Sequence, residues 1–205
     1  MKYFQIALIF IVFIPFLKGQ SYEQVALDFY ATAILDTQQN RKVYFDGNIS
    51  DEVYSDDIQG SKRSTVEEFY GCKIPRNAPD SIVMATFEIW EKIQGYKFSI
   101  IPPKESKLTI PKSIIYIPNL ESKTARNQLK KAVDKILNRN YIPEYQLSIS
   151  PSAIYKNHAY VEILLQGIED QSIQIIHLRI NSNKEIADWC KTGKMYHNGC
   201  YYSEE

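Results

Sequence analysis

His177 is the residue of this chain whose type and surroundings best fit acid–base chemistry. It lies in the apolar run IQIIHLRI, residues 173–180, and Asp188 is the carboxylate that the following segment offers. An imidazole that works as a general base needs a carboxylate or hydroxyl within hydrogen-bond reach. His177 and Asp188 are therefore the candidate catalytic pair of a hydrolase or isomerase. A structural or exposed histidine is the alternative.

Common catalytic motifs are absent from the sequence. It has no GxSxG elbow, no P-loop, no HExxH pair and no dinucleotide-binding glycine pattern. We therefore predict a non-catalytic domain without a cofactor that binds a ligand or a partner, and the enzyme is the alternative. A structural or adhesion component is a third hypothesis, which predicts an exposed apolar patch or an unpaired sheet edge.

Aromatic residues indicate what such a domain would bind. The chain has 15 tyrosines and 2 tryptophans, and aromatic faces stack on sugars and apolar ligands while tyrosine hydroxyls orient them. Tyr30, Trp90 and His177 lie on elements expected to surround a cavity, so they are the candidate ligand-binding residues for a small molecule or glycan. Packing in half-buried strands explains most of the other tyrosines.

Three cysteines follow the first 19 residues: Cys72, Cys190 and Cys200. Cys190 and Cys200 flank the turn-rich stretch KTGKMYHNG, so we predict a disulfide between them, with three reduced thiols as the alternative. A zinc site from Cys190, His197 and Cys200 lacks a fourth ligand and paired spacing. The calcium-like loop at residues 46–57 has an aspartate where that loop requires glycine, so no metal site is predicted.

Residues 1–19 have the composition of a secretory signal peptide. A basic start precedes an apolar stretch at residues 6–17, and the small residue Gly19 ends the segment. The stretch is shorter than the roughly 20 residues that a membrane span needs. No later segment of the sequence approaches a span, so none is expected after cleavage. We expect a secreted or periplasmic protein, with an uncleaved membrane anchor as the alternative.

Residues 20–205 carry a nearly balanced charge. Once Lys2 and Lys18 leave with the leader, 22 basic side chains face 24 acidic ones, whereas a nucleic-acid binder normally has a basic excess. Hydrophobic residues make up 44% of the chain, which is enough for one core of ordinary size. The sequence therefore predicts a single domain at residues 20–205 that does not bind nucleic acid.

Hydrophobic periodicity predicts a succession of helices and strands in this domain. A spacing of three to four residues marks each helix, and alternation or a continuous apolar run marks each strand. Residues 48–79 lack a clear period and are expected to form a long surface excursion. The expected helices are residues 21–37, 81–94 and 123–139, and the expected strands are residues 41–47, 97–101, 113–117, 146–150, 159–165, 173–180 and 185–189. The last four strands have hairpin-sized connections and are expected to form an antiparallel meander.

The order of these elements predicts an α+β fold with three helices packed on a curved, mainly antiparallel sheet. Together with the closing segment at residues 184–189, which contains EIADW, this order resembles the NTF2-like (cystatin-like α+β) family over residues 22–189. The resemblance implies a curved sheet that wraps helices around a cone-shaped pocket. Members of that family include both enzymes and non-catalytic binding modules, so it is compatible with either function.

Overall fold

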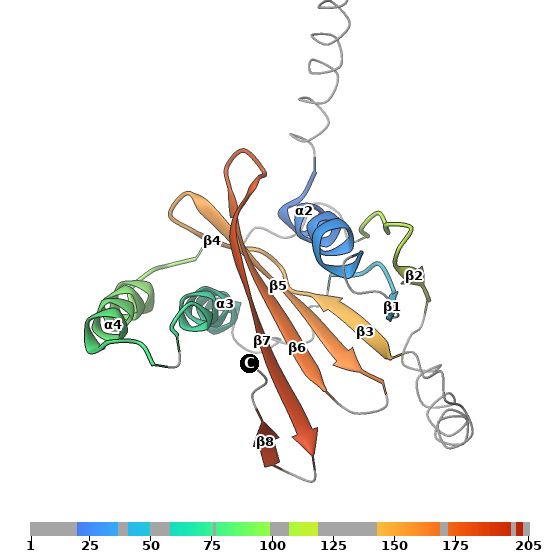
Figure 1. Ribbon diagram of the computed structural model, residues 1–205. Helices are drawn as coiled ribbons and strands as arrows, with labels where there is room; N and C mark the ends of the chain where they lie inside the picture. Colours follow the sequence, from blue (N-terminus) through green and yellow to red (C-terminus); the bar gives the residue numbers. More distant parts are fainter. Residues whose placement is uncertain are drawn as a thin grey trace, which may run out of the picture.

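A computed structural model describes residues 20–36, 41–49, 58–75, 77–98, 107–118, 143–168, 172–197 and 200–202. Within these residues, three α-helices accompany a mixed β-sheet that does not close on itself (Figure 1). The predicted α+β class is therefore confirmed. Residues 1–19, where a signal peptide is predicted, lie outside the described ranges.

The sheet has the strand order β2-β1-β3-β5-β6-β7-β8, and β4 pairs with β5 away from this path. The strands are β1 (Lys42–Phe45), β2 (Ile115–Tyr116), β3 (Glu144–Ile149), β4 (Ala153–Tyr155), β5 (His158–Gly167), β6 (Ile173–Asn181), β7 (Ile186–His197) and β8 (Cys200–Tyr202). β1 runs parallel to β2 and β3, and every other described pair is antiparallel. The mainly antiparallel sheet is confirmed.

The predicted meander corresponds to β3, β5, β6 and β7. The β-branched and aliphatic residues of β5 and β6 fit a pleated surface that is buried on both sides. The turn between β4 and β5 has two residues, because Tyr155 pairs with His158, and Lys156 adopts φ +53° there. A positive φ is the conformation that two-residue hairpins require. β7 extends beyond the predicted end at residue 189, as far as His197.

Helix α2 (Tyr22–Phe29) continues into the π-helical segment η1 (Tyr30–Leu35) and covers one face of the sheet. The helix predicted at residues 21–37 is thus confirmed over residues 22–35, and the Ser21 hydroxyl caps its start by accepting a 3.1 Å hydrogen bond from the Gln24 amide. Beneath α2 lies an aliphatic core that includes Leu27, Val161, Ile163, Leu165, Ile176, Leu178 and Ile180.

Helix α3 (Ile58–Cys72) lies where the sequence predicts a surface excursion, so that prediction is wrong for these residues. The helix packs on the sheet face opposite α2, and its buried positions follow a helical spacing: Lys62, Thr65, Val66 and Phe69. Half of these buried residues are polar. Because the inward stripe is not consistently apolar, hydrophobic periodicity does not identify this helix.

Helix α4 (Asp80–Gln94) lies within a residue of the predicted bounds and packs against α3 (Figure 1). Pro79 occupies its N-cap position, and Gly95, at the C-cap, has φ −83°. Part of its apolar surface is exposed, at Ile82, Met84 and Phe87. None of the helices in the described ranges is long and apolar enough to cross a membrane.

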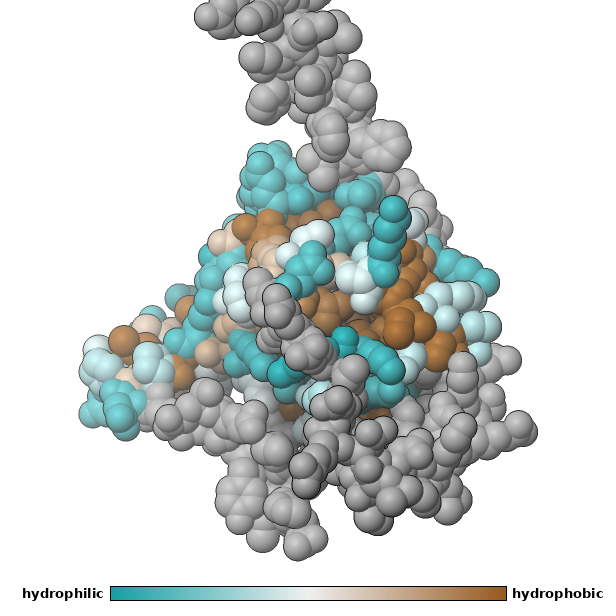
Figure 2. Space-filling model, turned by 45° about the vertical axis from the view of Figure 1, so that its right-hand side comes forward, coloured by the Kyte–Doolittle hydropathy of each residue, from teal (hydrophilic) through white to brown (hydrophobic). Residues whose placement is uncertain are grey.

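Other predicted elements are only partly visible. β2 confirms a strand within residues 113–117, whereas residues 97 and 98 belong to no strand. The helix predicted at residues 123–139 lies outside the described ranges. The β2 side of the molecule carries apolar surface that is broken up by hydrophilic side chains (Figure 2); Ile115 and Tyr116 are exposed there.

β7 contains one extra residue opposite β6. Ile180 pairs with Ile186. Its neighbour Arg179 pairs with Asp188, so Ala187 is left without a partner in β6. Such a β-bulge reverses which residues of a strand face which side. Beyond the bulge, the residues of β7 on the α3 side are Asp188, Cys190 and Thr192.

Candidate functional site

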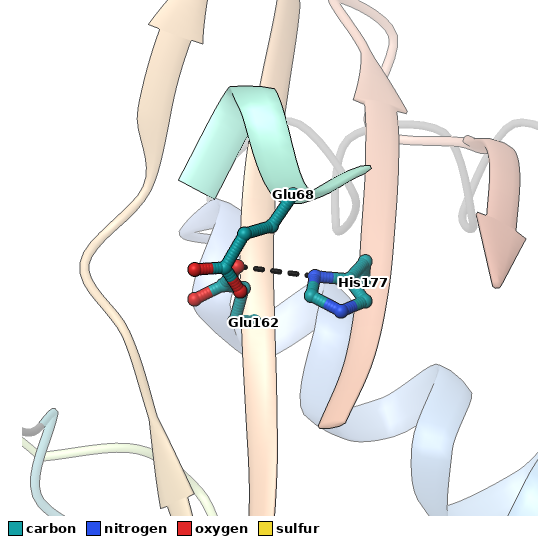
Figure 3. Close-up of side chains that lie close together, drawn as sticks. All are labelled: Glu68, Glu162 and His177. Carbon is teal, nitrogen blue, oxygen red and sulfur yellow. Dashed lines mark hydrogen bonds and ion pairs between the residues drawn. The ribbon is translucent and has the colours of Figure 1, made fainter. Parts of the chain in front are cut away.

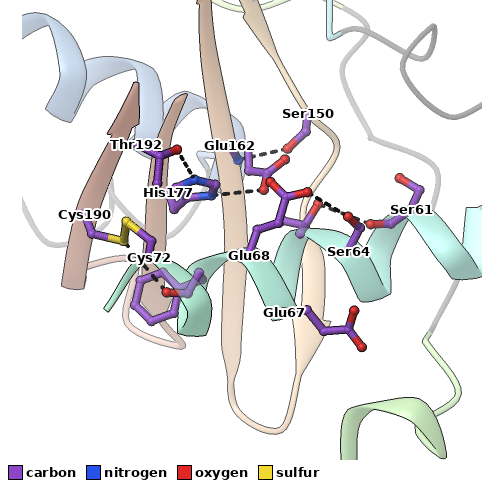
Figure 4. Close-up of polar contacts among 12 residues, drawn as sticks. Ser61, Ser64, Glu67, Glu68, Cys72, Ser150, Glu162, His177, Cys190 and Thr192 are labelled. Carbon is purple, nitrogen blue, oxygen red and sulfur yellow. Dashed lines mark hydrogen bonds and ion pairs between the residues drawn. A yellow bond between two sulfur atoms is a disulfide. The ribbon is translucent and has the colours of Figure 1, made fainter. Parts of the chain in front are cut away.

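The sheet presents a layer of polar side chains toward α3. Strand alternation places them on the face opposite the aliphatic core: Glu162 pairs with His177, Arg179 pairs with Asp188, and Thr192 lies two residues beyond Cys190, the partner of His177. We call this set the polar layer; it comprises Glu162, His177, Arg179, Asp188 and Thr192. Figure 4 shows three of its members, Glu162, His177 and Thr192, on the strands beside α3.

His177 forms a hydrogen bond through each ring nitrogen. Its Nδ1 lies 3.0 Å from Glu162 Oε1, and its Nε2 lies 3.0 Å from Thr192 Oγ1. An ionised carboxylate only accepts, so with a neutral ring Nδ1–H donates to Glu162 and the Thr192 hydroxyl donates to Nε2. Both His177 and Glu162 are buried, with 1% and 6% of their surface exposed. Burial of this kind requires the polar atoms to be paired, as they are here.

Glu162 is held by its own strand neighbours. The Ser150 hydroxyl, at the end of β3, accepts a 2.9 Å hydrogen bond from the Glu162 amide, and the Ser150 amide donates to the Glu162 carbonyl at 3.0 Å. Glu162 and His177 are also direct partners in the register of β5 and β6. The carboxylate and the imidazole are therefore positioned by backbone pairing as well as by their own contact.

A second carboxylate, Glu68, reaches this pair from α3 (Figure 3). One ligand atom from each of Glu68, Glu162 and His177 lies within 4.8 Å of the other two. Glu68 is exposed, and its Oε1 accepts a 2.9 Å hydrogen bond from the Ser64 hydroxyl one helical turn away. We call these three side chains the carboxylate–imidazole cluster; they are of the types that bind divalent cations.

A disulfide joins α3 to β7 beside the cluster. It links Cys72 to Cys190, with the Cα atoms 6.2 Å apart, so the predicted Cys190–Cys200 pair is wrong. Cys200 pairs with His197 at the β7–β8 turn. Seven residues of extended strand, roughly 23 Å, separate that turn from Cys190, and a disulfide spans less than about 7 Å between Cα atoms.

Asp188 does not contact His177, so the structure does not assemble the predicted catalytic pair. Its Oδ1 accepts a 2.6 Å hydrogen bond from Lys73 Nζ, and Lys73 also donates to the Trp189 carbonyl at 2.8 Å. Partial burial alone would raise the pKa of Asp188, but the hydrogen bonds from Lys73 and the Trp189 amide and the positive charges nearby outweigh it and lower that pKa. Asp188 therefore acts as an anchor for the end of α3.

The three predicted ligand-binding residues lie in different parts of the molecule. Tyr30 is fully buried under the α2 face, where burial raises the pKa of its hydroxyl well above the ordinary value. Trp90 lies on α4, where its ring packs on Phe87 and its Nε1 donates to the Glu67 carbonyl at 3.2 Å. Only His177 belongs to the cluster, so Tyr30 and Trp90 do not line a common site with it.

Sequence reasoning missed Glu68, Glu162 and Thr192. Glu162 carried a usable signal, because it is a carboxylate inside the apolar strand AYVEILLQ, and an ionisable residue on a buried strand needs a partner. Glu68 and Thr192 carried none. Their roles depend on how α3 is placed and on the bulge at Ala187, which local patterns do not encode.

Comparison of the chain with protein-family models, with curated proteins and with solved structures finds no match in any of the three. The resemblance to the NTF2-like family therefore stays a prediction from element order.

Proposed function

We propose that this chain is an exported, non-catalytic domain that binds a small ligand at the carboxylate–imidazole cluster. The observation that carries the proposal is the convergence of Glu68, Glu162 and His177 from one helix and two strands. His177 uses both ring nitrogens in hydrogen bonds and is 1% exposed. Because a general base must reach the proton that it abstracts, such an enclosed imidazole is poorly placed to exchange protons with a substrate directly.

Export is supported by the disulfide and by the leader-like sequence. Disulfides persist in oxidising compartments and are rare in reducing ones, and Cys72–Cys190 connects elements 118 residues apart. The apolar segment at residues 6–17 is typical of a secretory signal. Both observations favour a secreted or periplasmic protein.

Thermal-shift measurements test the binding function in two arms. One arm adds divalent cations singly; the other adds amino acids, polyamines and oligosaccharides in the presence of a chelator. We expect a rise in Tm in at least one arm, because a ligand that binds only the folded state stabilises it. The rise should be absent in a Glu162→Leu/His177→Leu variant that folds. If neither arm raises the Tm of the unsubstituted chain, the proposed function is wrong.

A hydrolase is the second candidate. It is favoured by the chain of hydrogen bonds that runs from Glu162 through His177 to Thr192. A carboxylate that orients an imidazole, which in turn accepts a proton from a hydroxyl, is the arrangement used to activate oxygen nucleophiles. Thr192 is half-buried, so its hydroxyl is partly accessible. This candidate predicts turnover of an activated ester that a Thr192→Val variant loses. Turnover that persists in that variant contradicts it.

A further inference from the structure

We propose that the ligand of the carboxylate–imidazole cluster is a divalent transition-metal ion of the zinc class, held by Glu68, Glu162 and Nδ1 of His177. The inference rests on the proposed binding function and names its ligand. The three candidate ligand atoms already lie within 4.8 Å of one another (Figure 3).

The chemistry of the donors selects the ion. One imidazole nitrogen with two carboxylates suits borderline divalent ions such as Zn²⁺. Ca²⁺ and Mg²⁺ prefer sites made only of oxygen, with six or more ligands. The two carboxylates also match the charge of a divalent ion, which favours its entry into a mostly buried site.

The distances require little rearrangement. Zn–N and Zn–O bonds of about 2.0–2.2 Å place two ligands of one tetrahedral ion roughly 3.4 Å apart. His177 Nδ1 and Glu162 Oε1 are 3.0 Å apart, so they need to separate by only a few tenths of an ångström. Glu68 has a long, exposed side chain on α3, and a rotamer change carries its carboxylate the remaining distance.

Thr192 and Ser64 supply the outer contacts that such a site needs. When the ion replaces the proton on Nδ1, the proton of the neutral ring moves to Nε2, which then donates to Thr192 Oγ1 at 3.0 Å. A hydroxyl both donates and accepts, so Thr192 fits either tautomer. The Ser64 hydroxyl orients Glu68 in the same way. Hydrogen bonds of this kind fix ligand orientation and raise metal affinity.

The disulfide positions the helix that carries Glu68. Cys72 lies one helical turn beyond Glu68, on the same side of α3, and its bond to Cys190 fixes that turn against β7 (Figure 4). The contact of Lys73 with Asp188 adds a second attachment next to it. Glu68 is therefore a positioned ligand, although it is exposed.

The test measures Zn²⁺ binding to the purified chain after chelator treatment, by competition with a chromophoric chelator and by elemental analysis. We expect one Zn²⁺ per chain and a loss of affinity of at least 10-fold in Glu68→Gln and in His177→Gln. Co²⁺ should show a visible absorption band that both variants weaken. Glu67→Gln is the matched control, because its carboxylate accepts a 2.7 Å bond from Gln94 and points away from the cluster (Figure 4). This control should bind Zn²⁺ as the unsubstituted chain does.

The outcomes distinguish a failure of the metal assignment from a failure of the proposed binding function. Glu68 is exposed, so Glu68→Gln is expected to fold even where His177→Gln does not. Absence of stoichiometric Zn²⁺, or affinity equal in Glu68→Gln and Glu67→Gln, overturns the metal assignment. If an organic ligand in the chelator arm raises the Tm through Glu162 and His177 while Zn²⁺ does not bind, the metal inference fails and the binding function stands. If nothing binds, both fail.

Discussion

The two faces of the sheet are held in different ways. Under α2, the contacts are mainly apolar, through residues such as Leu27, Ile163 and Leu178. Under α3, the sheet presents the polar layer, and the helix is attached by a disulfide and by the Lys73–Asp188 ion pair. A face that keeps ionisable groups cannot rely on apolar burial alone, because paired charges contribute little net stability. On the α3 face, the disulfide and the ion pair supply part of the stability that apolar burial supplies under α2.

The same difference explains where chemistry is possible. An aliphatic core offers no ligand atoms, and its close packing tolerates little change. The α3 side holds the carboxylate–imidazole cluster next to an exposed helical residue, Glu68, so it combines fixed donors with one adjustable donor. We infer that the α2 face supplies most of the stability and that the α3 face supplies the site.

The largest expected effect comes from removing the disulfide. A Cys72→Ser/Cys190→Ser variant should lose about 4–5 kcal/mol of unfolding free energy, because the bond closes a loop of 118 residues. Hydrogen exchange should show that α3 amides lose more protection than those of α2. Reductant should lower the stability of the unsubstituted chain to that of the variant and leave the variant unchanged. Recovery of a Cys190–Cys200 peptide by non-reducing peptide mapping would contradict this pairing.

Truncation in the aliphatic core should cost somewhat less. Leu27 is fully buried in α2, and Leu27→Ala should lower the unfolding free energy by about 3 kcal/mol, within the range of such cavities. Urea unfolding measures this loss of unfolding free energy. Ile82→Ala, at an exposed position of α4, is the control and should change the free energy by less than about 0.5 kcal/mol. Equal losses in the two variants would show that α2 does not cover the main core.

A double-mutant cycle measures how much the contact between Glu162 and His177 in the polar layer contributes to stability. Each single change to leucine should cost about 1–3 kcal/mol, since it leaves a buried polar partner with fewer hydrogen bonds. The double variant should cost less than the two single losses together, because neither buried group is then left alone. Additive losses, measured by chemical denaturation, would mean that the 3.0 Å contact contributes no coupling.

The smallest expected effect is the pH dependence of the α3 attachment. The folded-state pKa of Asp188 lies below its ordinary value of 3.8. The ion pair therefore adds stability above that pH and loses it as the pH falls through the lowered pKa. Both partners are 37% exposed, so Asp188→Asn should cost less than about 1 kcal/mol at pH 7. The Tm difference from the unsubstituted chain should shrink toward pH 3; a difference that grows toward pH 3 would refute the assignment.

Much of the α2 face could be predicted from the sequence. The helix at residues 21–37 has an apolar stripe and a serine cap, and the strands of the meander alternate or are continuously apolar, so local patterns identify them. α3 could not be predicted in this way. Its inward positions include Lys62 and Thr65, so its buried stripe is not consistently apolar and hydrophobic periodicity does not mark it.

The site could be predicted only in part. His177 interrupts an apolar strand and is therefore recognisable in the sequence, but closeness in sequence predicts Asp188 as its partner. The register instead places Glu162 directly opposite His177, and Arg179 opposite Asp188. Strand register depends on long-range pairing and on the bulge at Ala187, neither of which is visible in periodicity.

That bulge also has a consequence for oxidative maturation of the chain. A β7 strand that paired without the extra residue would turn the thiol of Cys190 toward α2, on the far side of the sheet from Cys72. Closure of the Cys72–Cys190 bond therefore requires the native offset of β7. Formation of this bond therefore distinguishes chains with the native β7 alignment from misaligned ones.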